Sequence, residues 1–130
     1  MQAVILCGGL GTRLKKIYKN TPKALIKFNK TPNLNKIIND LFKQGFSNVV
    51  LLTSFKHEII LNIVKKNKFY KKIRIVRDKS YFGTGGALVG AKKFLNKNFI
   101  VILGDLFISF DYKKFYLNCI KKKQKSNIVI

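Results

Sequence analysis

Short apolar runs alternate with amphipathic segments along this chain, and this alternation restricts the fold more than any other feature. Runs rich in Val, Ile and Leu, each typical of a strand buried on both faces, occur at 2–7, 48–53, 73–77, 98–103 and 127–130. Between them, apolar residues recur at helical spacing in 33–45, 56–67, 84–95 and 112–123. This order predicts an α/β fold: a Rossmann-like, mostly parallel sheet with helices on both faces.

The helical segments also indicate which side chains turn inward. We expect these residues to face the core: Ile59, Ile60, Ile63 and Val64 in 56–67, Ala87, Leu88, Ala91 and Leu95 in 84–95, and Phe115, Tyr116, Cys119 and Ile120 in 112–123. Gly45 follows the apolar face of 33–45, at the position where a left-handed residue commonly ends a helix.

Length and composition fit one domain over residues 1–130, without an internal boundary. The residues are 47% hydrophobic, which is enough to bury a core. No apolar run approaches the ~20 residues that span a bilayer, and Met1 leads into an apolar stretch without the features of a signal peptide, so we expect a cytoplasmic protein without membrane contact. Ile130 lies inside an expected strand, which suggests a fragment.

The two cysteines and the strong positive charge give weaker signals. Cys7 and Cys119 have no metal-binding spacing, and we expect both to be reduced, buried thiols. The net charge of +22 would suit a nucleic-acid-binding module. However, the cations are spread along the chain and only Arg13, Arg74 and Arg77 are arginine, the residue that reads base edges, so we favour a compositional bias and no specific nucleic-acid partner.

A glycine-rich loop, in the sequence VILCGGLGTRLK at 4–15, follows the first expected strand. In an open α/β sheet, ligands bind at the carboxyl ends of the strands, where glycine N–H groups and an arginine can hold phosphate. The loop lacks the last glycine of a dinucleotide motif and the Gly-Lys-Ser/Thr ending of a P-loop, which leaves a mononucleotide triphosphate. The alternative is a glycine-rich turn with an incidental arginine.

Three further stretches add to this prediction. Pro22 and Lys23 follow the loop, and the lysine can reach back toward the same sheet edge. The segment 82–88, FGTGGAL, places three glycines between the third strand and its helix. Asp105 ends the fourth strand, where a carboxylate could hold a hard cation or stand solvated in a turn.

Together these stretches resemble the sugar-phosphate nucleotidyltransferase family. Its loop motif G-G-x-G-T-R-L is intact at residues 8–14, its Pro-Lys pair is at 22–23, its L-G-T-x-x-A segment corresponds to 82–87 with Phe82 in the first place, and its strand-end Gly-Asp is at 104–105. The segment 29–45 also resembles the family's approach to its first long helix. The resemblance implies nucleotide binding by Leu6, Gly8, Gly9, Gly11, Thr12, Arg13, Gly83, Thr84, Gly85 and Gly86.

The implied reaction transfers a nucleoside monophosphate from a nucleoside triphosphate to a sugar 1-phosphate and releases pyrophosphate, as a step toward cell-surface polysaccharides or glycan precursors. Arg13, Lys23 and Asp105 would be the catalytic residues, with Asp105 holding Mg²⁺. The G-T-G-G-A form is similar to guanylyltransferases for D-glycero-D-manno-heptose 1-phosphate or mannose 1-phosphate, which favours GTP. The lone His57 is expected to be a solvated helix residue, because a phosphate nucleophile needs no base.

The chain departs from the family at several positions. Ser80-Tyr81 replaces a frequent Glu-Pro, Leu103 replaces an Asn, and Leu25 stands in place of a common Pro-Met or Pro-Leu arrangement. In the family, a second metal-binding carboxylate and most of the sugar-binding wall come from beyond the equivalent of Ile130. An inactive or incomplete remnant therefore stays open as an alternative, as does a homo-oligomeric state.

Overall fold

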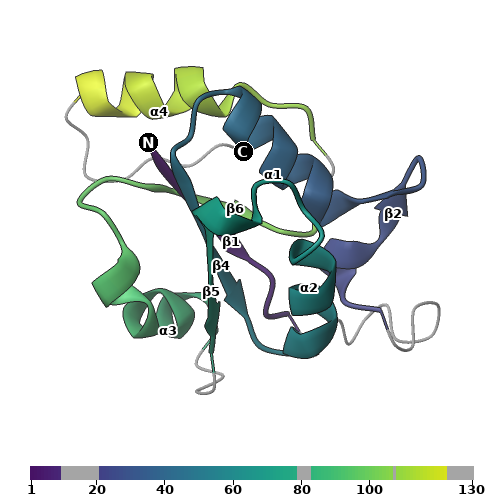
Figure 1. Ribbon diagram of the computed structural model, residues 1–130. Coiled ribbons are helices and arrows are strands. Elements are labelled where there is room, and N and C mark those ends of the chain that lie inside the picture. Colours follow the sequence, from purple (N-terminus) through teal and green to yellow (C-terminus); the bar gives the residue numbers. More distant parts are fainter. Residues whose placement is uncertain (10–20, 79–82, 107, 123–130) are drawn as a thin grey trace.

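A four-stranded parallel sheet forms the centre of the protein (Figure 1). The computed structural model describes residues 1–9, 21–78, 83–106 and 108–122. The strands stand in the order β5-β4-β1-β6 and have the bounds β1 Gln2–Leu6, β4 Asn48–Thr53, β5 Ile73–Arg77 and β6 Ile100–Leu103. Four of the five strands expected from the sequence are thus confirmed, and 127–130 lies outside the described residues.

The two central strands are buried on both faces, as their continuous apolar sequences predict. In β1, Ala3, Val4 and Ile5 have no exposed surface. Successive side chains point to opposite faces, so Ala3 and Ile5 belong to one core cluster and Val4 to the other. The sheet therefore needs a helical layer on each side.

Helices supply both layers (Figure 1). Helices α1 (Asn33–Lys43), α2 (His57–Val64) and α4 (Tyr112–Lys121) contribute to the core on one face. Helix α3 (Gly83–Gly90) covers the other face through Ala87 and Leu88, followed by a 3₁₀ turn, Lys92–Phe94. The predicted doubly covered parallel sheet is confirmed.

Gly45 ends helix α1 as predicted. Its φ of +86° is left-handed, its N–H donates to Phe42 O, and the Phe46 N–H donates to Leu41 O. This pair of bonds is a Schellman motif, which satisfies carbonyl groups at the end of the helix.

Several local expectations were wrong. Ile59 and Ile120, assigned to core faces, are 40% and 42% exposed. Ile60 is fully buried as expected, and in α4 the buried residue is Tyr112, which had not been assigned to the core face. Helix α3 ends at Gly90 rather than reaching residue 95. A small hairpin, β2 (Lys27–Phe28) with β3 (Thr31–Pro32), was not anticipated from the sequence.

The two cysteines differ in burial. Both cysteines are free; Cys7 is buried, but Cys119 is only partly buried, which corrects the expectation of two buried thiols. None of the helices in the described part of the chain combines the length and the apolar composition needed to cross a membrane.

Candidate active site

The site lies where the order of the strands changes direction. From β1 the chain passes through α1 to β4 and through α2 to β5, which extends the sheet one way. It then crosses through α3 to β6 on the other side of β1. Helix α1, which follows β1, and helix α3, which precedes β6, lie on opposite faces of the sheet. The carboxyl ends of β1 and β6 therefore border the crevice in which open α/β sheets bind ligands.

The loop after β1 begins at this crevice with Gly8 and Gly9. The Cys7 N–H still donates to Leu52 O at 2.7 Å, so the backbone remains tied to β4 up to the loop. A Cβ on Gly8 would lie 3.1 Å from the Ser54 Cβ, whereas a Cβ on Gly9 would meet no described residue within 4 Å. Among the described residues, packing thus restricts Gly8 but not Gly9.

The expected loop site also includes Leu6, Gly11, Thr12 and Arg13. Gly11, Thr12 and Arg13 lie outside the described residues, so their roles stay predictions. Leu6 lies at the end of β1, half-buried, between Leu52 of β4 and Leu103 of β6 in the strand register.

Gly104 brings the end of β6 against the end of β1. Its N–H donates to Leu6 O at 2.9 Å. A Cβ at this position would lie 2.8 Å from Cys7 Sγ, 3.0 Å from Leu6 O and 3.2 Å from the Ala24 Cβ. Three segments distant in sequence therefore meet here so closely that a side chain has no room.

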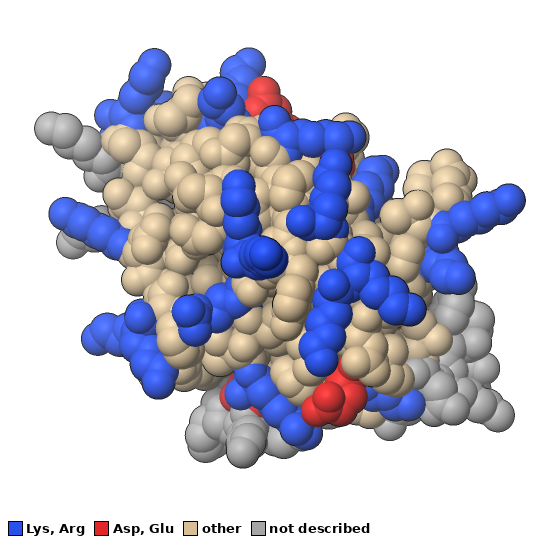
Figure 2. Space-filling model, in the orientation of Figure 1, with Lys and Arg blue, Asp and Glu red and all other residues tan. Residues whose placement is uncertain are grey.

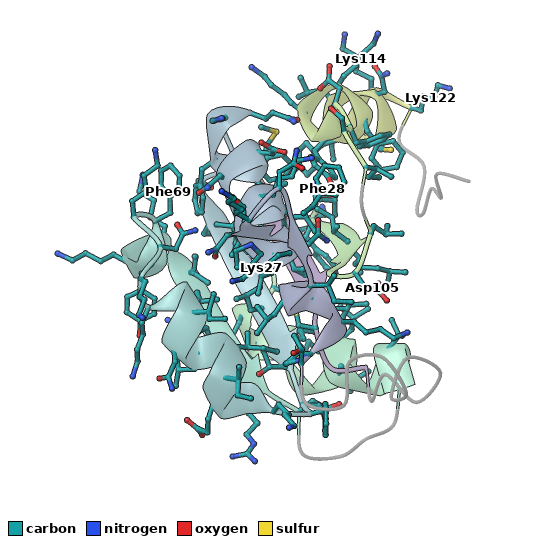
Figure 3. All side chains as sticks on the ribbon, turned by 90° about the vertical axis from the view of Figure 1, so that its right-hand side faces the viewer. Lys27, Phe28, Phe69, Asp105, Lys114 and Lys122 are labelled. Atoms are coloured by element: carbon teal, nitrogen blue, oxygen red, sulfur yellow. The ribbon has the colours of Figure 1, made fainter. Side chains whose placement is uncertain are left out.

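Lys23 and Asp105 extend from this junction toward each other. Lys23 begins the 3₁₀ turn Lys23–Leu25, which follows Pro22, and its Nζ lies 4.0 Å from Asp105 Oδ2. Their side chains are 30% and 44% exposed, so the pair contributes little to stability and both groups can reach a ligand. Asp105 lies away from Lys114 of α4 and from Lys122, which follows that helix (Figure 3).

Cys7 lies beneath the junction as a neutral thiol. Burial, and secondarily the charge of Asp105, raise the pKa of Cys7 to about 12. The thiolate is the nucleophilic form of cysteine, so Cys7 does not supply a nucleophile near neutral pH. Its contact with the Gly104 position indicates a packing role.

The second glycine segment lies in a helix, which corrects the expectation of a connecting loop. Gly83, Thr84, Gly85 and Gly86 form the first turn of α3, with Gly83 at φ +71° and the first three exposed. The first N–H groups of a helix have no partner within it and can bind an anion or a carbonyl oxygen. This segment follows β5, two strands away from β1.

Other polar residues near the carboxyl edge were not anticipated. The Oγ of Ser54, which is buried next to Gly8, has no hydrogen-bond partner among the described residues. Thr53 Oγ1 lies 2.7 Å from Nδ1 of His57, so this histidine is tied to the end of β4 rather than merely solvated. Asn33, buried at the start of α1, donates to the carbonyl groups on both sides of Asp105. A buried asparagine has no sequence signal of its own.

The carboxylate of Asp105 is suited to hold a magnesium ion. Among the described residues, no three His, Cys, Asp or Glu side chains gather as a metal cluster. Mg²⁺ usually keeps several waters and binds one or two carboxylates together with substrate phosphates. The half-exposed carboxylate of Asp105 fits that mode of binding.

Two named enzymes are similar in sequence to this chain. The D-glycero-α-D-manno-heptose 1-phosphate guanylyltransferase of Campylobacter jejuni is 41% identical over 98% of this chain and 59% of its own length. The enzyme of the same name from Aneurinibacillus thermoaerophilus is 34% identical over 89% of this chain and 51% of its own. The chain thus spans about half the length of these relatives.

A solved structure and a family model are also similar to this chain. HddC from Yersinia pseudotuberculosis, complexed with GMP-PN, superposes with a TM-score of 0.80 at 36% identity, over 92% of this chain and 54% of that one. A family model described as nucleotidyl transferase matches residues 2–130, which confirms the resemblance seen in the motifs. The chain therefore belongs to the nucleotidyl transferase family.

Proposed function

We propose that this protein transfers GMP from GTP to a sugar 1-phosphate, giving a GDP-sugar and pyrophosphate. The observation that carries the proposal is the approach of Lys23 to Asp105, 4.0 Å apart, beside the junction where Gly104 packs against Leu6 and Cys7 at the start of the glycine-rich loop. The guanylyltransferase names of the relatives, and the guanine nucleotide in the HddC complex, support the choice of GTP.

The chemistry suits these residues. An oxygen of the sugar 1-phosphate attacks the α-phosphorus of GTP, a new P–O bond forms, and the bond to the β-phosphate breaks with release of pyrophosphate. The attacking phosphate is already ionised, so no side chain has to remove a proton. Positioning and neutralisation of charge therefore account for the catalysis.

Lys23, Gly9, Asp105 and Arg13 each have a part in this scheme. The Lys23 ammonium group neutralises charge on the reacting phosphates, and Gly9, whose Cβ position meets no described residue within 4 Å, lets them approach the backbone. Asp105 would hold Mg²⁺, which supplies further neutralisation of phosphate charge when bound. Arg13 is expected to neutralise the leaving pyrophosphate.

The basic surface does not favour the nucleic-acid alternative. Figure 2 shows lysine and arginine scattered over the visible face rather than gathered on one element. The expected cytoplasmic location and the homo-oligomeric state stay predictions.

Calorimetric titration tests the proposal. GTP, ATP, CTP, UTP and dTTP are titrated with and without Mg²⁺. We expect GTP to bind most tightly, and we expect it to reach its full affinity only when Mg²⁺ is present. Asp105→Asn should abolish the dependence on Mg²⁺. Asp111→Asn is the matched control, because Asp111 caps helix α4 through the Lys114 N–H. The absence of binding by all five nucleotides would refute the nucleotide site.

The second substrate is tested by pyrophosphate release from GTP with mannose 1-phosphate or heptose 1-phosphate. We expect Arg13→Ala and Asp105→Asn to abolish release by a protein of the relatives' full length. The family resemblance places most of the sugar-binding wall beyond the equivalent of Ile130, so residues 1–130 alone should orient the sugar 1-phosphate poorly. Orientation of both substrates contributes ~7–11 kcal/mol to such reactions. We therefore expect little turnover by these residues alone. Robust turnover by these residues would show that they contain the complete site.

A further inference from the structure

The amide of Asn33 connects helix α1 to the turn that carries Asp105. Asn33 is only 1% exposed. Its Nδ2 donates to Gly104 O at 3.0 Å and to Leu106 O at 2.8 Å. These carbonyl groups belong to the residues immediately before and after Asp105, so a single side chain fixes the backbone on both sides of that carboxylate.

The backbone of Asn33 connects to Lys23 as well. The Asn33 N–H donates to Ile26 O at 3.0 Å, and the Ile26 N–H donates to Lys23 O at 3.1 Å. Asn33 thus bonds to the end of β6 through its side chain and to the 3₁₀ turn of Lys23 through its main chain. These are the two segments whose charged groups lie 4.0 Å apart.

Packing alone does not account for an asparagine here. Leu34, the next residue in the helix, is fully buried, and an apolar side chain of similar size would fill the same space at position 33. Among uncharged side chains, only the amide NH₂ group of Asn or Gln carries two donors and can serve two carbonyl oxygens at once. The residue type is therefore explained by its two bonds around Asp105.

We propose that Asn33 is a positioning residue of the active site, which holds the Asp105 carboxylate and the Lys23 ammonium group in register for a magnesium-bound nucleoside triphosphate. This inference rests on the proposed function, since it assigns Asp105 and Lys23 to that site. Asn33 does not itself touch the reacting atoms in this scheme. It acts by restricting the backbone on both sides of Asp105.

The matched variants are Asn33→Leu and Gln44→Leu. Gln44 follows the other end of α1 and also bridges two backbone groups: its Nε2 donates to Phe110 O at 2.9 Å, and its Oε1 accepts from the Lys113 N–H at 3.1 Å. Both substitutions remove an amide with two long-range bonds. Only Asn33 is bonded near Asp105.

Hydrogen exchange without nucleotide is the first measurement. Relative to a core amide such as that of Leu51, exchange at the Gly104 and Leu106 N–H groups should increase about 10-fold in Asn33→Leu and stay near the wild-type value in Gln44→Leu. Equal exchange at these amides in both variants would overturn the positioning role, whether or not the protein binds nucleotide.

GTP affinity with and without Mg²⁺ is the second measurement. Mg²⁺ should raise the GTP affinity of Asn33→Leu about 10-fold less than it raises that of the wild type, as expected for a residue that orients a metal ligand. The GTP affinity without Mg²⁺ should be unchanged. Gln44→Leu should keep the full gain. An equal magnesium gain in the wild type and Asn33→Leu would overturn the inference and leave the proposed function standing. If the wild type binds no nucleotide, the proposed function fails, and the exchange experiment still decides whether Asn33 orders the turn.

Discussion

Replacing Gly104 by alanine tests the close packing of the site. The new Cβ would lie 2.8 Å from Cys7 Sγ and 3.0 Å from Leu6 O. The sulfur belongs to a buried side chain, and the oxygen belongs to the strand backbone that accepts the Gly104 N–H at 2.9 Å. Neither atom can move without disturbing the junction of β1 and β6, so the substitution should be destabilising.

The magnitude follows from two opposing effects. Overpacking a core by one methyl group costs typically ~1–3 kcal/mol. Alanine lowers the entropy of the unfolded chain relative to glycine, which offsets ~0.4–1 kcal/mol of that cost. We therefore expect Gly104→Ala to lower the free energy of unfolding by about 1–2 kcal/mol.

Urea denaturation followed by far-ultraviolet circular dichroism measures this change. Gly9→Ala is the control, because a Cβ there meets none of the described residues within 4 Å, and its free energy of unfolding should not fall. Cys7→Ala removes the sulfur and should relieve part of the clash, so the double variant should show a coupling energy of about 1 kcal/mol. If Gly104→Ala is as stable as Gly9→Ala, the steric argument is wrong.

Four other predictions concern charge, reactivity, the hairpin and the basic surface. Lys23→Gln should weaken binding of magnesium-bound GTP in calorimetry because it removes the cation beside Asp105, whereas Lys27→Gln on β2 should not; equal losses would refute a specific role. Iodoacetamide at pH 8 should modify Cys119 before Cys7, whose pKa of about 12 keeps it protonated, and mass spectrometry of the labelled peptides will show whether this order holds. Lys30→Gly should raise the free energy of unfolding in urea by about 1 kcal/mol, because Lys30 has a left-handed φ of +67° that glycine adopts at little cost; an unchanged value would mean that the hairpin does not hold this conformation. Fluorescence anisotropy should show weak DNA binding that is independent of sequence and lost by ~200 mM salt, and a salt-resistant preference for one sequence would instead support a nucleic-acid module.

Much of the architecture could be predicted because its signals are local. Continuous apolar runs predicted β1 and β4, since strands covered on both faces carry no polar side. Gly45 predicted the end of α1 because a left-handed residue there favours glycine. The hairpin turn was missed because Lys30 adopts a left-handed conformation in which glycine is expected. Ile59 and Ile120 were misplaced because helical spacing gives an apolar stripe but not its width.

The candidate site divides in the same way. The sequence by itself determined the alternation of strands and helices along the chain and the family motifs with their residue types, because these depend on neighbours along the chain. The order of the strands in the sheet came from the structure. Only the tertiary structure decided that Lys23 meets Asp105, that Gly104 has no room for a side chain, and that Asn33 bonds to carbonyl groups 71 and 73 residues away. Such contacts depend on how β1, β6 and α1 pack in three dimensions, and no periodicity along the chain encodes that geometry.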